Sequence, residues 1–219
     1  LANFMSGEGS GTKKDPARMR ETFYHEVLEL QDTFSALEDC RIPTIASIQG
    51  ACVGGAIDMA AACDMRYCSE DAFFKIAEVD IGIAADVGTL QRLPSLIPLA
   101  VVRELAYTGR RFEAKEAKEL GLVNKVFESR DDLKDGVLKV AKEIASKSPL
   151  VTRVIKKQIN YSRDHSVKDA LDYHAIWNSS LISGQDMEEA MKAYMSKTQG
   201  SYDDLEPKKS FWEKDEKLV

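Results

Sequence analysis

An apolar segment followed by closely spaced glycines is the feature that most constrains this chain. Residues 44–49 (TIASIQ) predict a short buried β-strand, and residues 56–63 have a helical composition. Gly50, Gly54 and Gly55 lie between them and predict a tight turn, because glycine adopts backbone conformations that other residues avoid. A strand, a glycine turn and a helix in direct succession indicate an α/β fold.

The composition is that of a folded globular protein. The chain has 219 residues, of which 44% are hydrophobic and 30% charged, and its formal net charge is −6. This length allows one sizeable core in one or two domains. We expect no nucleic-acid partner, because a net acidic chain is a poor general ligand for nucleic acids. We also expect no membrane span, because no apolar run reaches the about 18 residues that a spanning helix needs.

Hydrophobic spacing predicts the other elements. A stripe of apolar residues between Met19 and Leu37 predicts a helix that ends before Pro43. Short strands are expected over residues 65–68, 73–76 and 122–127, and helices over residues 100–108, 113–120, 133–144, 149–162, 167–182 and 187–197. We therefore divide the chain into an α/β core, a helical module and a charged tail. Their expected ranges are 1–127, 128–197 and 198–219.

The four cysteines show no CxxC spacing and have no histidine cluster nearby. They are Cys40, Cys52, Cys63 and Cys68. This pattern favours reduced cysteines in the core over a disulfide scaffold or a zinc site. We accordingly expect a protein of a reducing compartment, not a secreted one.

The glycine turn is the first candidate for chemistry. At the N-terminus of a helix, the backbone N–H groups of Gly54 and Gly55 could hold an anion or a developing oxyanion. A tight packing turn is the alternative that the glycines alone leave open. Asp58 follows within an apolar helical segment, where it is either a functional acid or a charge placed favourably in the first turn of the helix.

Three further carboxylates lie in an otherwise apolar segment, residues 78–89 (EVDIGIAADVGT). They are Glu78, Asp80 and Asp86. Carboxylates among apolar neighbours suit general acid or base roles near neutral pH. The structural alternatives are an ion pair with Arg92 and, for Asp86, the N-cap of a following helix.

Several runs together resemble a known family. Residues 47–59 (SIQGACVGGAIDM) and 62–66 (ACDMR) are similar to the enoyl-CoA hydratase/isomerase (crotonase) superfamily. Residues 72–94 and 161–178, which include EVDIGIAADVGTLQRLP and YSRDHSV, resemble the dienoyl-CoA isomerases within that superfamily. The resemblance covers about residues 17 to 195.

The resemblance implies a crotonase-like ββα spiral core followed by a C-terminal helical trimerisation module. The family has an earlier Phe-x-x-Gly-x-Asp motif, which supplies a second oxyanion donor. Residues 4–7 could be a degenerate form of it, but residues 1–20 look more like the loop that follows it. We therefore expect that the N-terminal strands are missing from this sequence. An exposed sheet edge, an incomplete active site and lower activity or solubility would follow.

The resemblance also assigns the site. The Gly55 N–H, with Gly54 beside it, would be half of an oxyanion hole. Asp58, Glu78 and Asp86 would be the acids, and they lie 20 and 8 positions apart as in the family. Asp86 would remove a proton from C2, Glu78 would protonate C6, and Asp58 would orient the pair. Asp86 separates this pattern from ordinary hydratases, which generally have glycine there.

The implied activity is conversion of 3,5-dienoyl-CoA to 2,4-dienoyl-CoA in fatty-acid β-oxidation. It would need no metal or redox cofactor, since CoA is part of the acyl-CoA thioester substrate. The resemblance further implies a homotrimer or a dimer of trimers, in mitochondria or peroxisomes. Two alternatives stay open: a 2-enoyl-CoA hydratase or other crotonase-type isomerase that uses Glu78 and Asp58, and a truncated, non-catalytic binding or assembly form.

Overall fold

The computed structural model describes residues 15–182 and 184–207. The proposed degenerate motif at residues 4–7 lies outside the described residues, and so does most of the expected charged tail. Within them, no helix is both long and apolar enough to cross a membrane. The domain boundaries expected from the sequence stay a prediction.

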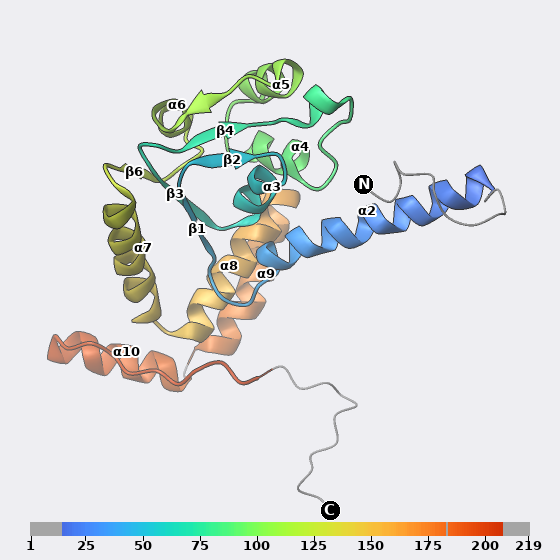
Figure 1. The fold of residues 1–219 in the computed structure, drawn as a ribbon. Coiled ribbons are helices and arrows are strands. Elements are labelled where there is room, and N and C mark those ends of the chain that lie inside the picture. The colour runs from blue at the N-terminus through green and yellow to red at the C-terminus, as the bar shows by residue number, and fades with distance from the viewer. Residues whose placement is uncertain (1–14, 183, 208–219) are drawn as a thin grey trace, which may run out of the picture.

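The first described element is a long helix, α2 (Pro16–Glu38). Asp15 caps it, since its carboxylate accepts a hydrogen bond from the Ala17 N–H. The apolar stripe predicted this helix correctly, but none of its residues is buried. Figure 1 shows the reason: only the C-terminal part of α2 lies against the body of the protein, and the rest projects away from it.

Two small sheets form the α/β part. The first is parallel, with strand order β1 (Ile45–Ile48), β3 (Met65–Ser69) and β6 (Lys125–Phe127). The second contains β2 (Ala51–Val53), β4 (Phe73–Lys75) and β5 (Phe112–Glu113), of which β2 and β4 are parallel and β5 is antiparallel to β4. In the described part of the chain, β1 and β2 are edge strands.

The glycine segment differs from the single tight turn that the sequence predicts. Gly50 and Gly54 both have a positive φ, 63° and 56°, and residues 51–53 between them form strand β2. The two glycines therefore make two bends. The first moves the chain from the parallel sheet to the second sheet, and the other moves it from β2 into α3 (Gly55–Ala62).

The hydrophobic core lies between the sheets, α3 and the helices that follow. Phe74 of β4 and Phe112 of β5 are buried and stacked, with ring centroids 5.3 Å apart. Cys52 and Cys68 are buried in this core as free thiols. Burial raises the pKa of Cys52 to about 12 and that of Cys68 to about 11. Cys40 and Cys63 are free thiols that are only partly buried.

The later part of the chain is mainly helical, as predicted. Its elements are η1 (Glu78–Ile81), α4 (Thr89–Arg92), η2 (Leu93–Ser95), α5 (Leu99–Thr108), α6 (Ala114–Glu119), α7 (Arg130–Ala145), α8 (Pro149–Asp164), α9 (Val167–Leu181) and α10 (Gln185–Ser196). The apolar segment over residues 78–89 includes the short helix η1. Ser148 and Ser166 cap α8 and α9. Gly184 is the N-cap of α10, and the Asp186 carboxylate in its first turn accepts from the Ser148 hydroxyl.

A buried ion pair fixes α8 on the α/β part. Lys156 Nζ lies 2.8 Å from Asp64 Oδ2, and it also donates to the carbonyls of Leu37 and Ile42. The same Asp64 oxygen accepts from the backbone N–H and the hydroxyl of Thr44. A buried lysine with these partners is well satisfied, so the start of β1, the end of α3 and α8 are held together at one point.

Substitutions at Leu105 and Tyr107 of α5 test how much the buried core contributes to the free energy of unfolding. Leu105 is fully buried and Tyr107 is 75% exposed. Leu105→Ala should lower the free energy of unfolding by about 2–5 kcal/mol, because it removes buried methyl groups and leaves a cavity. Tyr107→Ala should change it by less than about 0.5 kcal/mol. Urea denaturation followed by circular dichroism measures both, and equal losses in the two variants would contradict this core.

Candidate active site

The N-terminus of α3 forms the centre of the candidate site. The Gly54 N–H donates to the Lys75 carbonyl at 3.1 Å, which ties the turn to the end of β4. Gly55 is the first residue of α3 and is exposed. Backbone N–H groups in the first turn of a helix have no acceptor within the helix. The positive end of the α3 dipole therefore faces a surface that a carbonyl oxygen can approach.

Glu78 lies directly against this turn. Its Oε1 is 3.1 Å from the position that a Cβ on Gly54 would occupy. Its other oxygen, Oε2, is buried and has no hydrogen-bond partner in the described part of the chain. The structure therefore brings together two residues that are 24 positions apart in sequence. An unpartnered carboxylate oxygen next to a helix N-terminus is available to exchange a proton with a bound molecule.

Asp58 is fully buried in the first turn of α3. Its Oδ1 accepts a hydrogen bond of 2.5 Å from the backbone N–H of Thr89, the first residue of α4. Its Oδ2 has no partner among the described residues. The carboxylate thus lies in the first turn of one helix, as the structural alternative had it, and also accepts from the first N–H of another. The same contact fixes α4 against α3.

Asp86 lies in an exposed position two residues before Gly88, the N-cap of α4. It is therefore not the N-cap that the sequence suggested as an alternative. No hydrogen bond or ion pair joins its carboxylate to Glu78 or Asp58 in the described part of the chain. Its backbone carbonyl accepts a hydrogen bond of 2.7 Å from Gln31 Nε2.

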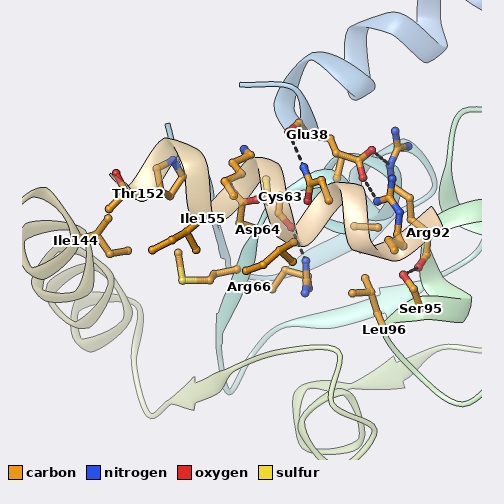
Figure 2. A pocket seen from close by; sticks show the side chains of 18 residues that line it. Glu38, Cys63, Asp64, Arg66, Arg92, Ser95, Leu96, Ile144, Thr152 and Ile155 are labelled. Atoms are coloured by element: carbon orange, nitrogen blue, oxygen red, sulfur yellow. Dashed lines mark hydrogen bonds and ion pairs between the residues drawn. The ribbon is translucent and has the colours of Figure 1, made fainter. Parts of the chain in front are cut away.

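The alternative in which Arg92 pairs with an acid of residues 78–89 is wrong. Arg92 Nε instead pairs with Glu38 Oε2 at 3.0 Å, and Arg163 of α8 pairs with the other Glu38 oxygen. Asp80, the third acid of residues 78–89, forms a 2.6 Å ion pair with Lys75. Figure 2 shows Arg92 and Glu38 facing each other beside a cavity.

That cavity, of about 560 Å³, lies at the opposite end of α3 from the candidate site. It lies between α8 and the end of α3, and its lining includes Ala62, Arg66 and Ile155. A separate cavity of about 430 Å³ is lined by Asp86 together with Gln31 and Arg163. Asp86 thus adjoins a hollow large enough for part of a small-molecule ligand. Over residues 15–182 and 184–207, no group of three or more His, Cys, Asp or Glu side chains is arranged to hold a metal ion.

A comparison with protein-family profiles decides the family. The profile described as enoyl-CoA hydratase/isomerase matches residues 7–205.

The chain belongs to the enoyl-CoA hydratase/isomerase family.

Curated relatives agree with this membership. The chain is 49% identical over 188 residues to an Arabidopsis thaliana protein named peroxisomal Delta(3,5)-Delta(2,4)-dienoyl-CoA isomerase, covering 86% of this chain and 68% of the relative. It is 46% identical over 180 residues to the human protein named mitochondrial Delta(3,5)-Delta(2,4)-dienoyl-CoA isomerase, covering 82% of this chain. The match spans only 55% of the human protein's length.

Solved structures of the family share the fold. An enoyl-CoA hydratase from Bacillus anthracis superposes with a TM-score of 0.79 and 31% sequence identity, covering 88% of this chain and 72% of that one. The crotonase-like α/β fold expected from the resemblance is thereby confirmed. The roles of Gly54, Gly55, Asp58, Glu78 and Asp86 are not tested by these comparisons and remain predictions.

Sequence reasoning missed the residues that hold the site in place. Neither the Gln31 contact to the Asp86 carbonyl nor the Thr89 contact to Asp58 was expected. For Thr89 a signal existed, because it follows Gly88 at the start of a helix and its N–H needs an acceptor. For Gln31 no local signal exists, because its partner lies 55 residues away.

Asp58 should contribute to stability as well as to the site. In Asp58→Ala the buried Thr89 N–H loses its acceptor, so the free energy of unfolding should fall by about 1–3 kcal/mol. Asp80→Ala removes only a surface ion pair and should cost about 0–1 kcal/mol. Chemical denaturation compares the two variants. A loss in Asp80→Ala as large as in Asp58→Ala would show that the buried contact is not the stabilising one.

Glu38 should make stability depend on pH. Burial acts to raise the pKa of this carboxyl, but the hydrogen bonds from Arg163 and Arg92 outweigh burial and hold the pKa below its usual value. A carboxyl with a lowered folded-state pKa stabilises the protein above its unfolded-state pKa. That contribution is lost as pH falls through the folded-state value. Glu38→Gln should therefore be less stable than wild type near neutral pH.

Denaturation midpoints of wild type and Glu38→Gln, measured between about pH 7 and about pH 3.5, test this dependence. The difference between the two proteins should shrink toward acid pH, because the wild-type carboxyl becomes protonated there. Glu21→Gln is the matched control, since Glu21 is an exposed acid of the same helix that pairs with His25. A difference that stays constant with pH would contradict the role of the Glu38 charge.

Proposed function

We propose that this chain is a dienoyl-CoA isomerase, which converts a 3,5-dienoyl-CoA to the 2,4-dienoyl-CoA. The observation that carries the proposal is the Glu78 carboxylate, with its buried and unpartnered oxygen, against Gly54 at the N-terminus of α3. This geometry puts a proton donor or acceptor next to backbone donors suited to a thioester oxygen. The names of the Arabidopsis and human relatives support the choice of substrate.

The proposed reaction removes one proton from the substrate and adds another at a different carbon. Asp86 removes a proton from C2, and the electron pair shifts into the thioester to give a dienolate. The Gly55 N–H stabilises the negative oxygen of this dienolate. Glu78 then donates a proton to C6, so the double bonds come to lie at C2 and C4. Exchange of protons with solvent returns Asp86 and Glu78 to their starting states, and Asp58 orients the α3 turn and α4 throughout.

These steps use only carboxylates and backbone N–H groups, so we propose that the enzyme works without a metal or redox cofactor. CoA enters as part of the acyl-CoA thioester. By analogy with the names of its relatives, the protein would act in fatty-acid β-oxidation in a mitochondrion or a peroxisome. The proposal includes neither a membrane span nor a nucleic-acid partner.

Assembly into a homotrimer or a dimer of trimers is part of the same proposal. Large apolar side chains are exposed along the C-terminal helices α9 and α10: Val167, Leu171, Ile176, Tyr194 and Met195. Exposed apolar surface of this extent is usually covered by another chain. These helices are therefore the surface through which we expect copies to associate.

Hydration of a 2-enoyl-CoA is the second candidate. It is favoured by one observation: Asp58 and Glu78 both carry a buried unpartnered oxygen, whereas the Asp86 carboxylate contacts neither of them. A hydratase would use Glu78 and Asp58 around a water molecule. The similarity to a solved enoyl-CoA hydratase at 31% identity is compatible with this candidate.

A spectrophotometric assay with a 3,5-dienoyl-CoA decides between the candidates, because the product diene is conjugated with the thioester and absorbs more strongly. Wild type should turn over the substrate. Asp86→Asn and Glu78→Gln should each lower kcat by about 10²-fold or more, since each removes an acid or base. Asp80→Asn, which changes the acid paired with Lys75, is the matched control and should retain wild-type kcat.

Two other outcomes would favour a different function. Hydration of a 2-enoyl-CoA that survives in Asp86→Asn would establish the hydratase. A folded wild-type protein that is inactive on both substrates would favour a binding or assembly form without catalysis.

A further inference from the structure

The segment that carries Asp86 is held by its backbone and not by its carboxylate. The Asp86 side chain is exposed, whereas its carbonyl accepts a 2.7 Å hydrogen bond from Gln31 Nε2. Gln31 belongs to α2, which precedes the whole α/β core in sequence. The position of the carboxylate is therefore set by a contact to the main chain behind it.

Arg92 holds the next carbonyl in the segment. Its Nη1 donates to the Val87 carbonyl at 3.4 Å, and its Nη2 donates to the Ser35 hydroxyl of α2 at 3.1 Å. Gly88 makes room for this guanidinium, because a Cβ there would lie 1.8 Å from Nη1. Gly88 also has a φ of 135°, which side-chain-bearing residues rarely adopt. Arg92 and Gln31 thus bind consecutive carbonyls of the segment.

Glu38 fixes the direction of Arg92. One of its oxygens accepts from Arg92 Nε at 3.0 Å, and the other pairs with Arg163 of α8. Its backbone carbonyl also accepts from Asn160 Nδ2 of α8 at 3.3 Å. Both side chains of the Arg92–Glu38 pair are mostly shielded from solvent, 13% and 18% exposed. A shielded guanidinium with three different acceptors has little rotational freedom.

The segment is anchored at its far end as well. The Thr89 N–H donates to the buried Asp58, and Ala85 is itself buried. Between these two anchors, the contacts to Gln31 and Arg92 are the hydrogen bonds that reach residues 86 and 87 in the described part of the chain. A segment with so few hydrogen bonds opens at a low free-energy cost when one of them is removed.

We propose that Gln31 and Arg92 are positioning residues for Asp86. They hold the carbonyls of residues 86 and 87, and thereby fix where the Asp86 carboxylate lies relative to a bound substrate. Glu38 orients Arg92, and its pairing with Arg163 couples this arrangement to the C-terminal helices. The catalytic consequence rests on the proposed isomerase function, whereas the restraint on the segment does not.

A purely structural role makes different predictions. If Arg92 only joined α2, α4 and α8, its loss would lower global stability and would leave the local motion of residues 86–88 unchanged. Gln31 separates the two roles, because in the described part of the chain its side chain donates to the Asp86 carbonyl alone and lies outside the Arg92–Glu38–Arg163 cluster. Gln31→Met removes the donor at similar side-chain volume, so it tests positioning with little effect on packing.

Two measurements on the same samples test the proposal. Backbone ¹⁵N order parameters of residues 86–88 report the restraint without any substrate. They should fall from the value of about 0.85 of a rigid backbone to about 0.6 or less in Gln31→Met and in Arg92→Lys, since lysine keeps the charge but loses the planar fork of donors. In the isomerase assay, kcat should fall by about 10- to 100-fold with KM nearly unchanged, because a displacement of about 1 Å at a reacting group can cost 10²-fold in rate.

Gln185→Met and Arg111→Lys are the matched controls. Gln185 donates to Asp203 and Arg111 pairs with Glu113, both away from the Asp86 segment. They should leave the order parameters of residues 86–88 and kcat at wild-type values.

Unchanged order parameters at residues 86–88 in folded Gln31→Met and Arg92→Lys would overturn the proposal. So would lowered order parameters with wild-type kcat in an active enzyme. Whether the wild-type protein turns over dienoyl-CoA tests only the proposed function, because the order parameters decide the restraint without any substrate.

Discussion

The Asp58 carboxylate is the constraint on which the rest of the site depends. It is buried within the first turn of α3, and the hydrogen bond that it makes in the described part of the chain is to the first N–H of α4. Removing a carboxylate from water is costly unless its partners are well placed. Once Asp58 is fixed, the glycine turn that precedes it and the segment that ends at Thr89 are fixed relative to each other. The two halves of the candidate site, Gly54 with Glu78 on one side and Asp86 on the other, meet through this contact.

A second set of charges joins this centre to the C-terminal helices. Lys156 of α8 is buried against Asp64, and Arg163 of the same helix pairs with Glu38 of α2. The helical part is therefore attached to the α/β part at two separate points along α8. Both points lie next to the cavity of Figure 2, so the helix bridges a partly open space instead of resting on a continuous apolar face. Polar contacts thus fix α8, whereas α7 packs on the parallel sheet with Leu133 buried.

Local patterns predicted most elements, because helix periodicity and capping depend on neighbouring residues. The stripe beginning at Met19 is an example. Strand β2 was missed, since three residues between glycines carry no periodicity and become a strand only by pairing with β4. The candidate acids came from the family resemblance, whereas the contact between Gln31 and Asp86 joins residues 55 positions apart. Such a pairing depends on how two finished elements pack, and no local pattern reports it.

The two adjacent glycines at the start of α3 differ in how replaceable they are. Gly54 combines a φ of 56° with a Glu78 oxygen 3.1 Å from where a methyl group would stand. Gly55 has no positive φ, and a methyl group there would meet its nearest neighbour, Phe34, at an ordinary 3.8 Å. Alanine in place of Gly55 would meet no steric or conformational obstacle within the protein and would keep the backbone N–H. The fold itself therefore requires glycine only at the first of the two positions.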